Sequence, residues 1–167
     1  MSAIPDSRRK AEHKLATRKT LAAAIAEHPF LKDVSPDHLP VLADNAMRVQ
    51  FEPGAFIFRE RDPANRFYLI ESGQVALESR SGDEPALLIQ TIGPGDVLGW
   101  SWLFPPYYWH FDARAIESTA AIFFYGTRLR EQCEEDHDLG YELMTRVTSV
   151  VIQRLQAARK QLFEIRH

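Results

Sequence analysis

The stretch RFYLIESGQVALESRSGDEPALLIQTIGPGDVLG, residues 66–99, decides the fold of this 167-residue chain. Its short apolar runs are separated by three turn-forming sequences, SG at 72–73, SGD at 81–83 and GPGD at 93–96. Short apolar runs bounded by glycine-containing turns about every ten residues are typical of antiparallel strands. The stretch therefore predicts an antiparallel sandwich or barrel.

The same pattern extends to both sides of this stretch. Upstream, the runs 48–51 and 55–58 flank the turn Glu52-Pro53-Gly54. Downstream, the runs 111–116 and 120–125 predict two more strands, and Gly126 ends the second. Within 66–99 itself the predicted strands are 66–71, 74–78, 86–91 and 97–98.

Helices are predicted at both ends of the chain. The region 10–28 is rich in Ala, Lys, Arg, Leu and Glu, and its helix is expected to end at His28 because Pro29 follows. Ser35-Pro36 predicts an N-cap followed by proline at N1, opening a short helix through Leu42. Three parts follow: a helical extension over 1–45, a β-domain over 46–126 and C-terminal helices over 127–167.

The segment 137–165 predicts one long helix with two apolar stripes. The first stripe has the alternating steps of three and four of a heptad seam and comprises Tyr141, Met144, Thr148, Val151, Leu155, Ala158, Leu162 and Ile165. The second comprises Leu139, Leu143, Val147 and Val150. One stripe can pack on the β-domain while the seam meets a second copy, so a homodimer is predicted. The alternative is a helix buried on both faces within one subunit.

Composition excludes several classes of protein. Hydrophobic content of 45%, charged content of 26% and a net charge of −3 are those of a globular domain without an overall nucleic-acid footprint. A basic run, Arg8, Arg9, Lys10, Lys14, Arg18 and Lys19, predicts a solvated helix face; the alternative is an arm that touches DNA or a membrane. No apolar run approaches the roughly 20 residues of a membrane span, and no secretory signal is apparent.

Cysteine usage and motifs favour a cytoplasmic regulator over an enzyme. The lone Cys133 excludes an internal disulfide, and its flanking carboxylates are expected to raise the pKa of its thiol. No nucleophile elbow, Walker loop, paired-carboxylate motif or zinc-ligand spacing occurs in the sequence. We therefore expect no enzymatic activity, no metal and no cofactor.

All three tryptophans fall in the window 99–111, GWSWLFPPYYWHF. A Gly-rich turn leading from a strand into a short helix is a frequent anion site, because free backbone N–H groups point outward there. In this chain the side chains around that position are bulky rings. The window therefore predicts the frame of a phosphate pocket with an apolar lining.

From residue 28 onward the chain resembles the cyclic nucleotide-binding domain of the cyclic AMP receptor protein (Crp/Fnr) family. The resemblance rests on Phe51–Gly54, Phe67–Val75, Ile92–Gly99 and the helix containing Arg154-Leu155-Gln156. It implies an eight-stranded jelly-roll β-barrel, mainly β with flanking helices, a phosphate-binding cassette at about 98–115 and a dimerisation helix. Family members that regulate transcription carry a helix-turn-helix domain after that helix. This chain ends at His167, so we expect no direct DNA readout through such a domain. The expected action is through a partner protein; the alternatives are that the sequence is a fragment of a longer protein or that the module serves as a ligand buffer.

The sequence departs from the family at the residues that contact the cyclic nucleotide. The family cassette has a Glu for the ribose hydroxyl after its glycine and an Arg-Ser pair for the cyclic phosphate. Here Gly99 is followed by Trp100, and Trp109-His110 align with the Arg-Ser pair. A Thr-Ser pair that touches the base in close relatives of the cyclic AMP receptor corresponds to Ala158-Arg159.

These departures predict a regulatory module with an altered, aromatic-lined pocket that does not bind cyclic AMP or cyclic GMP in the usual way. The ligand would be an unknown small molecule and would reposition the 137–165 helix. One alternative is a genuine cyclic nucleotide sensor that reaches the phosphate with Arg114 or Arg159. Another is an interaction module whose pocket is filled by Trp100 and Trp109. The candidate ligand-binding residues are Gly99, Trp100, Ser101, Trp109, His110, Arg114 and Arg159.

Overall fold

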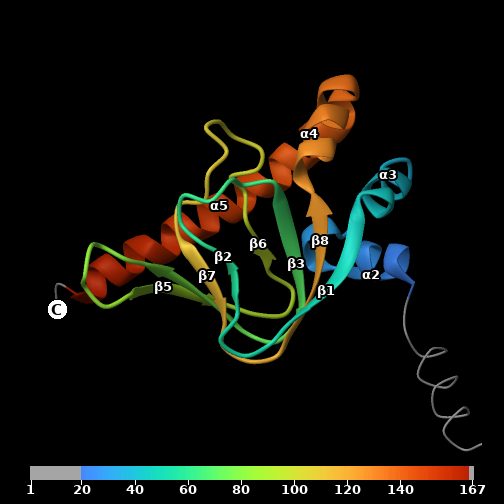
Figure 1. Cartoon of the computed structure of the whole chain (residues 1–167). Helices are drawn as coiled ribbons and strands as arrows, with labels where there is room; N and C mark the ends of the chain where they lie inside the picture. The colour runs from blue at the N-terminus through green and yellow to red at the C-terminus, as the bar shows by residue number, and fades with distance from the viewer. Residues whose placement is uncertain (1–19, 166–167) are drawn as a thin grey trace, which may run out of the picture.

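A computed structural model describes residues 20–165 of the chain. Eight strands and a set of flanking helices follow one another in the order that the sequence predicts (Figure 1). The strands are β1 (Ala46–Phe51), β2 (Phe56–Phe58), β3 (Arg66–Ser72), β4 (Val75–Ser79), β5 (Leu87–Ile92), β6 (Val97–Leu98), β7 (Asp112–Ala115) and β8 (Thr119–Tyr125). The helices are α2 (Leu21–Glu27), the 3-10 helix η1 (Pro29–Leu31), α3 (Leu39–Asp44), α4 (Gly126–Glu135) and α5 (His137–Ile165).

The strands form two four-stranded antiparallel sheets. Their orders are β1-β8-β3-β6 and β2-β7-β4-β5, so neighbouring strands in each sheet come from distant parts of the sequence. This is the double-sheet arrangement of a jelly roll. The predicted fold, mainly β with flanking helices, is confirmed.

The sheet containing β3 and β8 is buried on both faces. On β3, Phe67 and Leu69 face the helices, whereas Tyr68 and Ile70 face the interior of the β-roll. Side chains of a strand alternate between faces, so a strand covered on both sides must be apolar at consecutive positions. The uninterrupted runs FYLI and AIFF in β3 and β8 thus reflect two hydrophobic clusters on opposite faces of one sheet.

We call these two clusters the helix-side cluster and the roll cluster. The helix-side cluster lies between the sheet and the helices and includes Ile25, Leu31, Leu42, Phe67, Trp102, Phe124, Leu129 and Leu143. The roll cluster lies between the two sheets and includes Phe58, Tyr68, Leu77, Ile92, Leu98, Trp109, Phe111 and Phe123.

Helix α5 has two different halves. Leu139, Leu143 and Val147 in its first half are buried in the helix-side cluster. The second half lies alongside the β-roll with its end near β5, where Gln161 donates a hydrogen bond to the carbonyl of Ile89 (Figure 1). Residues 155–165 are exposed apart from Ala157. The predicted second apolar stripe therefore packs on the protein, while most of the predicted seam is in solvent.

Two helix boundaries differ from the prediction. Helix α2 begins at Leu21, and Thr20, in an extended conformation, is its N-cap, so the prediction of one continuous helix over 10–28 is wrong at Thr20. The helix ends before His28-Pro29 as expected. Residues 10–19 of the predicted helix and the basic run lie outside the described residues. Helix α3 begins at Leu39 rather than after Ser35, and Ser35 is not its N-cap. The backbone N–H of Ser35 instead donates to Oε1 of Glu142 on α5 at 3.1 Å, so a tertiary contact holds this segment in a turn.

His28 joins the helical extension to the β-roll. Its Nδ1 accepts from the N–H of Phe30 at 3.2 Å, so its Nε2 carries the proton and donates to the carbonyl of Ile70 at 3.1 Å. This arrangement requires the neutral ring. Burial lowers the pKa of His28, against smaller opposing effects of the Ile70 hydrogen bond and of Glu71 and Asp96.

We expect acidification to destabilise the protein through His28. The pKa of His28 is lower in the folded state than the value of 6.5 for the unfolded chain, so folding favours the neutral ring. This contribution to stability is fully present above pH 6.5 and is lost as the pH falls through the pKa of the folded state. Denaturant unfolding at pH 7.5 and 5.5 should show a loss on the order of 1 kcal/mol relative to a His28→Asn variant, whose amide can still accept from Phe30. Equal losses in the two proteins would contradict this assignment.

Candidate ligand site

The aromatic window joins β6 to β7 as a series of turns. Backbone hydrogen bonds link Leu103 to Trp100, Phe104 to Ser101 and Tyr107 to Phe104, but no helix forms between β6 and β7. The prediction of a short helix after Gly99 is therefore wrong, and this loop provides no helix dipole for an anion. Its second half is fixed to the 61–64 segment, since Trp109 N–H donates to Asp62 O at 3.0 Å and Ala64 N–H to Tyr107 O at 2.7 Å.

Trp109 lies inside the β-roll, against the glycine that the family cassette keeps. Its side chain is 4% exposed and stacks on Phe58 with ring centroids 3.8 Å apart. The tip of the indole is so close to Gly99 that a Cβ on Gly99 would lie 2.6 Å from it. Gly99 also has a φ of +94°, in the region that favours glycine. The space next to the cassette glycine is thus occupied by the protein's own ring.

Trp100 lies where the two hydrophobic clusters meet and touches α5. Its ring is partly buried, 5.6 Å from the ring of Phe111, and contacts both clusters. The guanidinium carbon of Arg154 lies 4.9 Å from the centre of the Trp100 ring, within range of a cation–π interaction. The same guanidinium donates through Nη2 to the carbonyl of Val97 on β6. Trp100 and β6 together hold the middle of α5.

Trp102 belongs to the helix-side cluster rather than to the candidate site. It is fully buried and stacks on Phe67 with ring centroids 4.7 Å apart. Its carbonyl accepts from Nη1 of Arg130 at 2.7 Å, and its Nε1 has no hydrogen-bond partner. The three tryptophans therefore occupy three different environments.

The remaining predicted site residues do not converge on one point. Ser101 is buried and His110 is exposed. Arg114 lies on β7 between the fully buried Ala113 and Ala115, on the opposite face of the strand, and its Nε donates to Oε1 of Glu78 at 2.7 Å. Arg159 is exposed on the second half of α5.

Arg154 is the cation that contacts the Trp100 ring, and it was not among the candidate residues selected from the sequence. Burial lowers the pKa of Arg154 to about 10, with Asp96 acting in the opposite direction. The only sequence signal was its position on the face of the helix that carries the second apolar stripe, seven residues after Val147. Burial also raises the pKa of the Cys133 thiol to about 11, and Asp136 and Glu134 add to the shift, in the expected direction.

The sequence profile that matches this chain describes a cyclic nucleotide-binding domain, and the match covers residues 48–136. This chain belongs to the cyclic nucleotide-binding domain family. It is a regulatory module of that superfamily, and the resemblance inferred from the turn sequences is confirmed. Between residues 20 and 165, no helix is long and apolar enough to cross a membrane.

The chain is similar in sequence to parts of proteins of different kinds. The chain is 25% identical over 141 residues to the CRP-like cAMP-activated global transcriptional regulator of Mycobacterium tuberculosis, covering 84% of this chain. It spans 61% of the length of that regulator. It is 36% identical over 78 residues to the acetyltransferase Pat of Mycolicibacterium smegmatis, a match to 47% of this chain and 23% of that enzyme.

Solved structures confirm the architecture. A candidate cyclic nucleotide-binding protein from Geobacter metallireducens superimposes with a TM-score of 0.74 at 28% identity, covering 82% of this chain and 99% of that chain. The regulatory subunit of a cAMP-independent protein kinase A from Trypanosoma brucei superimposes with a TM-score of 0.66 at 21% identity, covering 92% and 53%. The second likeness concerns the fold alone.

Proposed function

We propose that this domain is a regulatory module whose nucleotide pocket is filled by Trp109 and Trp100, so that it does not take cyclic AMP or cyclic GMP in the usual way. In this proposal it acts in the cytoplasm, as a homodimer, through the surface of α5. The observation that carries the proposal is the position of the Trp109 ring, which stacks on Phe58 and has its edge against Gly99. The alternative with an open, aromatic-lined pocket is disfavoured by the burial of Trp109.

The energy needed to open the pocket supports the proposal. A nucleotide that used the cassette glycine would have to displace the Trp109 ring from the roll cluster. Tryptophan buries roughly 150–250 Å² of surface, and burial contributes about 25 cal/mol per Å². Exposing this ring would therefore cost about 4–6 kcal/mol, which would come out of the binding free energy of any nucleotide.

The distribution of charge also supports the proposal. A cyclic phosphate in a closed pocket needs a paired cation, and removing one partner of a buried ion pair costs about 3–5 kcal/mol. That corresponds to a loss of roughly a hundred- to several-thousand-fold in affinity. Arg114 is paired with Glu78 on the other face of β7, and Arg159 is exposed on α5. Neither observation favours the alternative in which one of these residues takes the phosphate.

The relatives leave the ligand open. The Mycobacterium tuberculosis regulator is described as cAMP-activated, whereas the Trypanosoma brucei subunit belongs to a cAMP-independent kinase. The family fold is therefore compatible with regulation by cyclic AMP and with regulation independent of it. The side chains in the pocket determine which of the two applies.

Calorimetric titration with cyclic AMP and cyclic GMP tests the proposal. The unmodified chain is expected to give no binding heat, and the double variant Trp100→Glu/Trp109→Arg, which restores the family pair, is expected to gain binding. A Trp109→Leu variant is the matched control, because it vacates space without supplying a cation. Micromolar or tighter binding by the unmodified chain would overturn the proposal.

The proposed homodimer through α5 can be tested by a substitution in the predicted seam. Leu155 is 60% exposed and lies at the middle of the predicted seam. If the seam is buried in a dimer, Leu155→Glu places two carboxylates in that interface and should raise the dissociation constant of the dimer at least about tenfold. Sedimentation velocity over a concentration series measures this. Gln156→Glu, next to it on α5, is the control; an equal effect of both variants, or a monomeric parent, would contradict the interface.

A further inference from the structure

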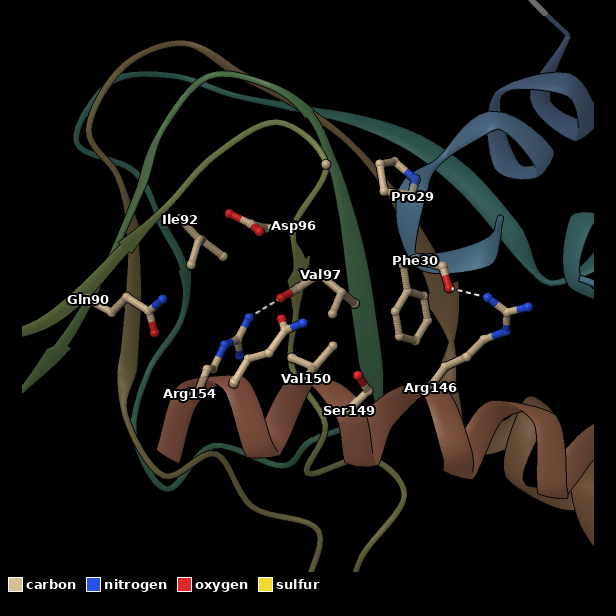
Figure 2. A pocket seen from close by; sticks show the side chains of 12 residues that line it. Pro29, Phe30, Gln90, Ile92, Asp96, Val97, Arg146, Ser149, Val150 and Arg154 are labelled. Atoms are coloured by element: carbon tan, nitrogen blue, oxygen red, sulfur yellow. Dashed lines mark hydrogen bonds between the residues drawn. The ribbon is translucent and has the colours of Figure 1, made fainter. Parts of the chain in front are cut away.

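A cavity of about 300 Å³ lies outside the roll cluster, between α5 and the turn that joins β5 to β6. Figure 2 shows Arg154 rising from α5 into this space, with Ile92 and Asp96 across from it and Val97 beside it. A volume of this size is at the lower end of small-molecule sites. The cavity is therefore large enough for a small organic molecule.

The guanidinium of Arg154 is incompletely satisfied in this cavity. Its Nη2 donates to a neutral acceptor, the carbonyl of Val97, and its Nη1 is buried with no acceptor. Within residues 20–165 no carboxylate forms a salt bridge with Arg154. A buried cation is normally paired, and an orphaned buried donor points to a missing ion, water or ligand.

The lining provides the rest of a binding site. Gln90, which is partly buried, and Ser149 and Gln153, which are exposed at the mouth of the cavity, have side chains with no hydrogen-bond partner among the described residues. Ile92, Val97 and Val150 supply an apolar surface on two sides. Convergent polar groups on an apolar wall are typical of small-molecule pockets.

The cavity is lined by two arginines, Arg146 and Arg154, and one carboxylate, Asp96, so the net charge of its lining is positive. Arg146, at the far end, donates through Nη1 to the carbonyl of Phe30 at 2.8 Å and through Nη2 to Glu142 at 3.4 Å, so its charge is paired with a carboxylate. The carboxylate of Asp96 accepts from the N–H of Gly93 at 2.9 Å. Among the described residues, Arg154 is thus the lining cation without a salt bridge, and its buried Nη1 has no acceptor.

We propose that this cavity binds a small organic oxyanion, with the carboxylate or phosphate group on Arg154 and the apolar part against Ile92, Val97 and Val150. Gln90, Ser149 and Gln153 would supply neutral hydrogen bonds. Because Nη1 is covered in the structure, binding would require the guanidinium to reorient within the cavity so that Nη1 reaches the ligand, which would alter its contact with Trp100. The site goes beyond the proposed function and is independent of whether the roll interior binds a nucleotide.

Titration calorimetry with hexanoate and with phenyl phosphate tests this site, with 1-hexanol and phenol as neutral counterparts. We expect saturable binding of at least one anion, no binding of the neutral compounds, and a change in tryptophan fluorescence that a Trp100→Phe variant reduces. Binding of hexanoate alone identifies a carboxylate site, and binding of phenyl phosphate alone identifies a phosphate site.

Two variants that act in different ways locate the binding. Arg154→Gln removes the cation and Ser149→Phe fills the cavity, and each should weaken binding at least about tenfold. Arg159→Gln, which removes an exposed cation from the same helix, should leave binding unchanged. Undiminished binding in Ser149→Phe, equal weakening by Arg159→Gln, or no saturation by either anion up to about 10 mM, near the weak limit of specific binding, would overturn the proposal. The oxyanion site is located by the Arg154 and Ser149 variants, and the nucleotide pocket is tested by the Trp100→Glu/Trp109→Arg variant, so failure of one proposal does not imply failure of the other.

Discussion

Replacing Trp102 by alanine is expected to lower the free energy of unfolding by about 3–5 kcal/mol, the range for large aromatic residues in protein cores. The ring is fully buried in the helix-side cluster and stacks on Phe67, which itself stacks on Phe124 at 4.5 Å. Its loss would leave a cavity where the β-roll meets the helices. Urea unfolding, followed by circular dichroism, measures the effect.

Trp102→Phe is the matched control for this prediction. Phenylalanine can keep the stack on Phe67, and it removes the indole N–H that has no partner. Deleting an unsatisfied buried donor offsets part of the lost packing, so we expect a loss of about 1–2 kcal/mol. Losses of equal size in Trp102→Ala and Trp102→Phe would show that the stack contributes little.

Gly99→Ala is expected to destabilise the protein by about 2–4 kcal/mol, from two additive causes. One is backbone strain, because φ is +94°. The other is a clash of the new methyl group with the indole of Trp109, which would be 2.6 Å away and cannot move without leaving its stack on Phe58. Chemical denaturation of the variant provides the measurement.

A double-mutant cycle separates the two causes. In a Trp109→Leu background the clash should vanish, leaving a cost of about 1–2 kcal/mol from the backbone alone. Gly54→Ala is the control for that backbone cost, since its φ is +85° and nothing lies within 4 Å of its added Cβ. If Gly99→Ala costs the same with and without Trp109, the ring does not occupy the space beside the cassette glycine.

The strands could be predicted from sequence because turns and apolar runs are local signals. Gly73, Gly82 and Gly95 mark turns at positive φ, and the runs between them have the length of single strands. Helix α5 was predicted with its observed bounds because its apolar periodicity extends over eight turns. Helix α3 was misplaced because a bond from Ser35 to Glu142, 107 positions away, overrides the local capping signal.

The site was less predictable, because it depends on contacts between distant segments. The sequence indicated that rings replace the usual ligand contacts, but it did not distinguish Trp102, on the helix side of the sheet, from Trp109, inside the roll. The expected short helix after Gly99 failed because the loop is tied through Tyr107 and Trp109 to the 61–64 segment instead. Arg154 carries no local signature of burial, since its position depends on how α5 lies against β6.

The first half of α5 is packed and most of the part after Arg154 is exposed. A tilt of the exposed part about Arg154 would therefore move the end of the helix. At about 1.5 Å of rise per residue, the eleven residues that follow extend roughly 16 Å beyond Arg154. A tilt of 10° at Arg154 would therefore move the helix end by about 3 Å. Among residues 20–165, the bond from Gln161 to Ile89 is the one hydrogen bond that ties this part of the helix to the β-roll. If binding at Arg154 tilts the helix, as the two proposals together would require, the displacement would be largest at the surface proposed to contact a second subunit.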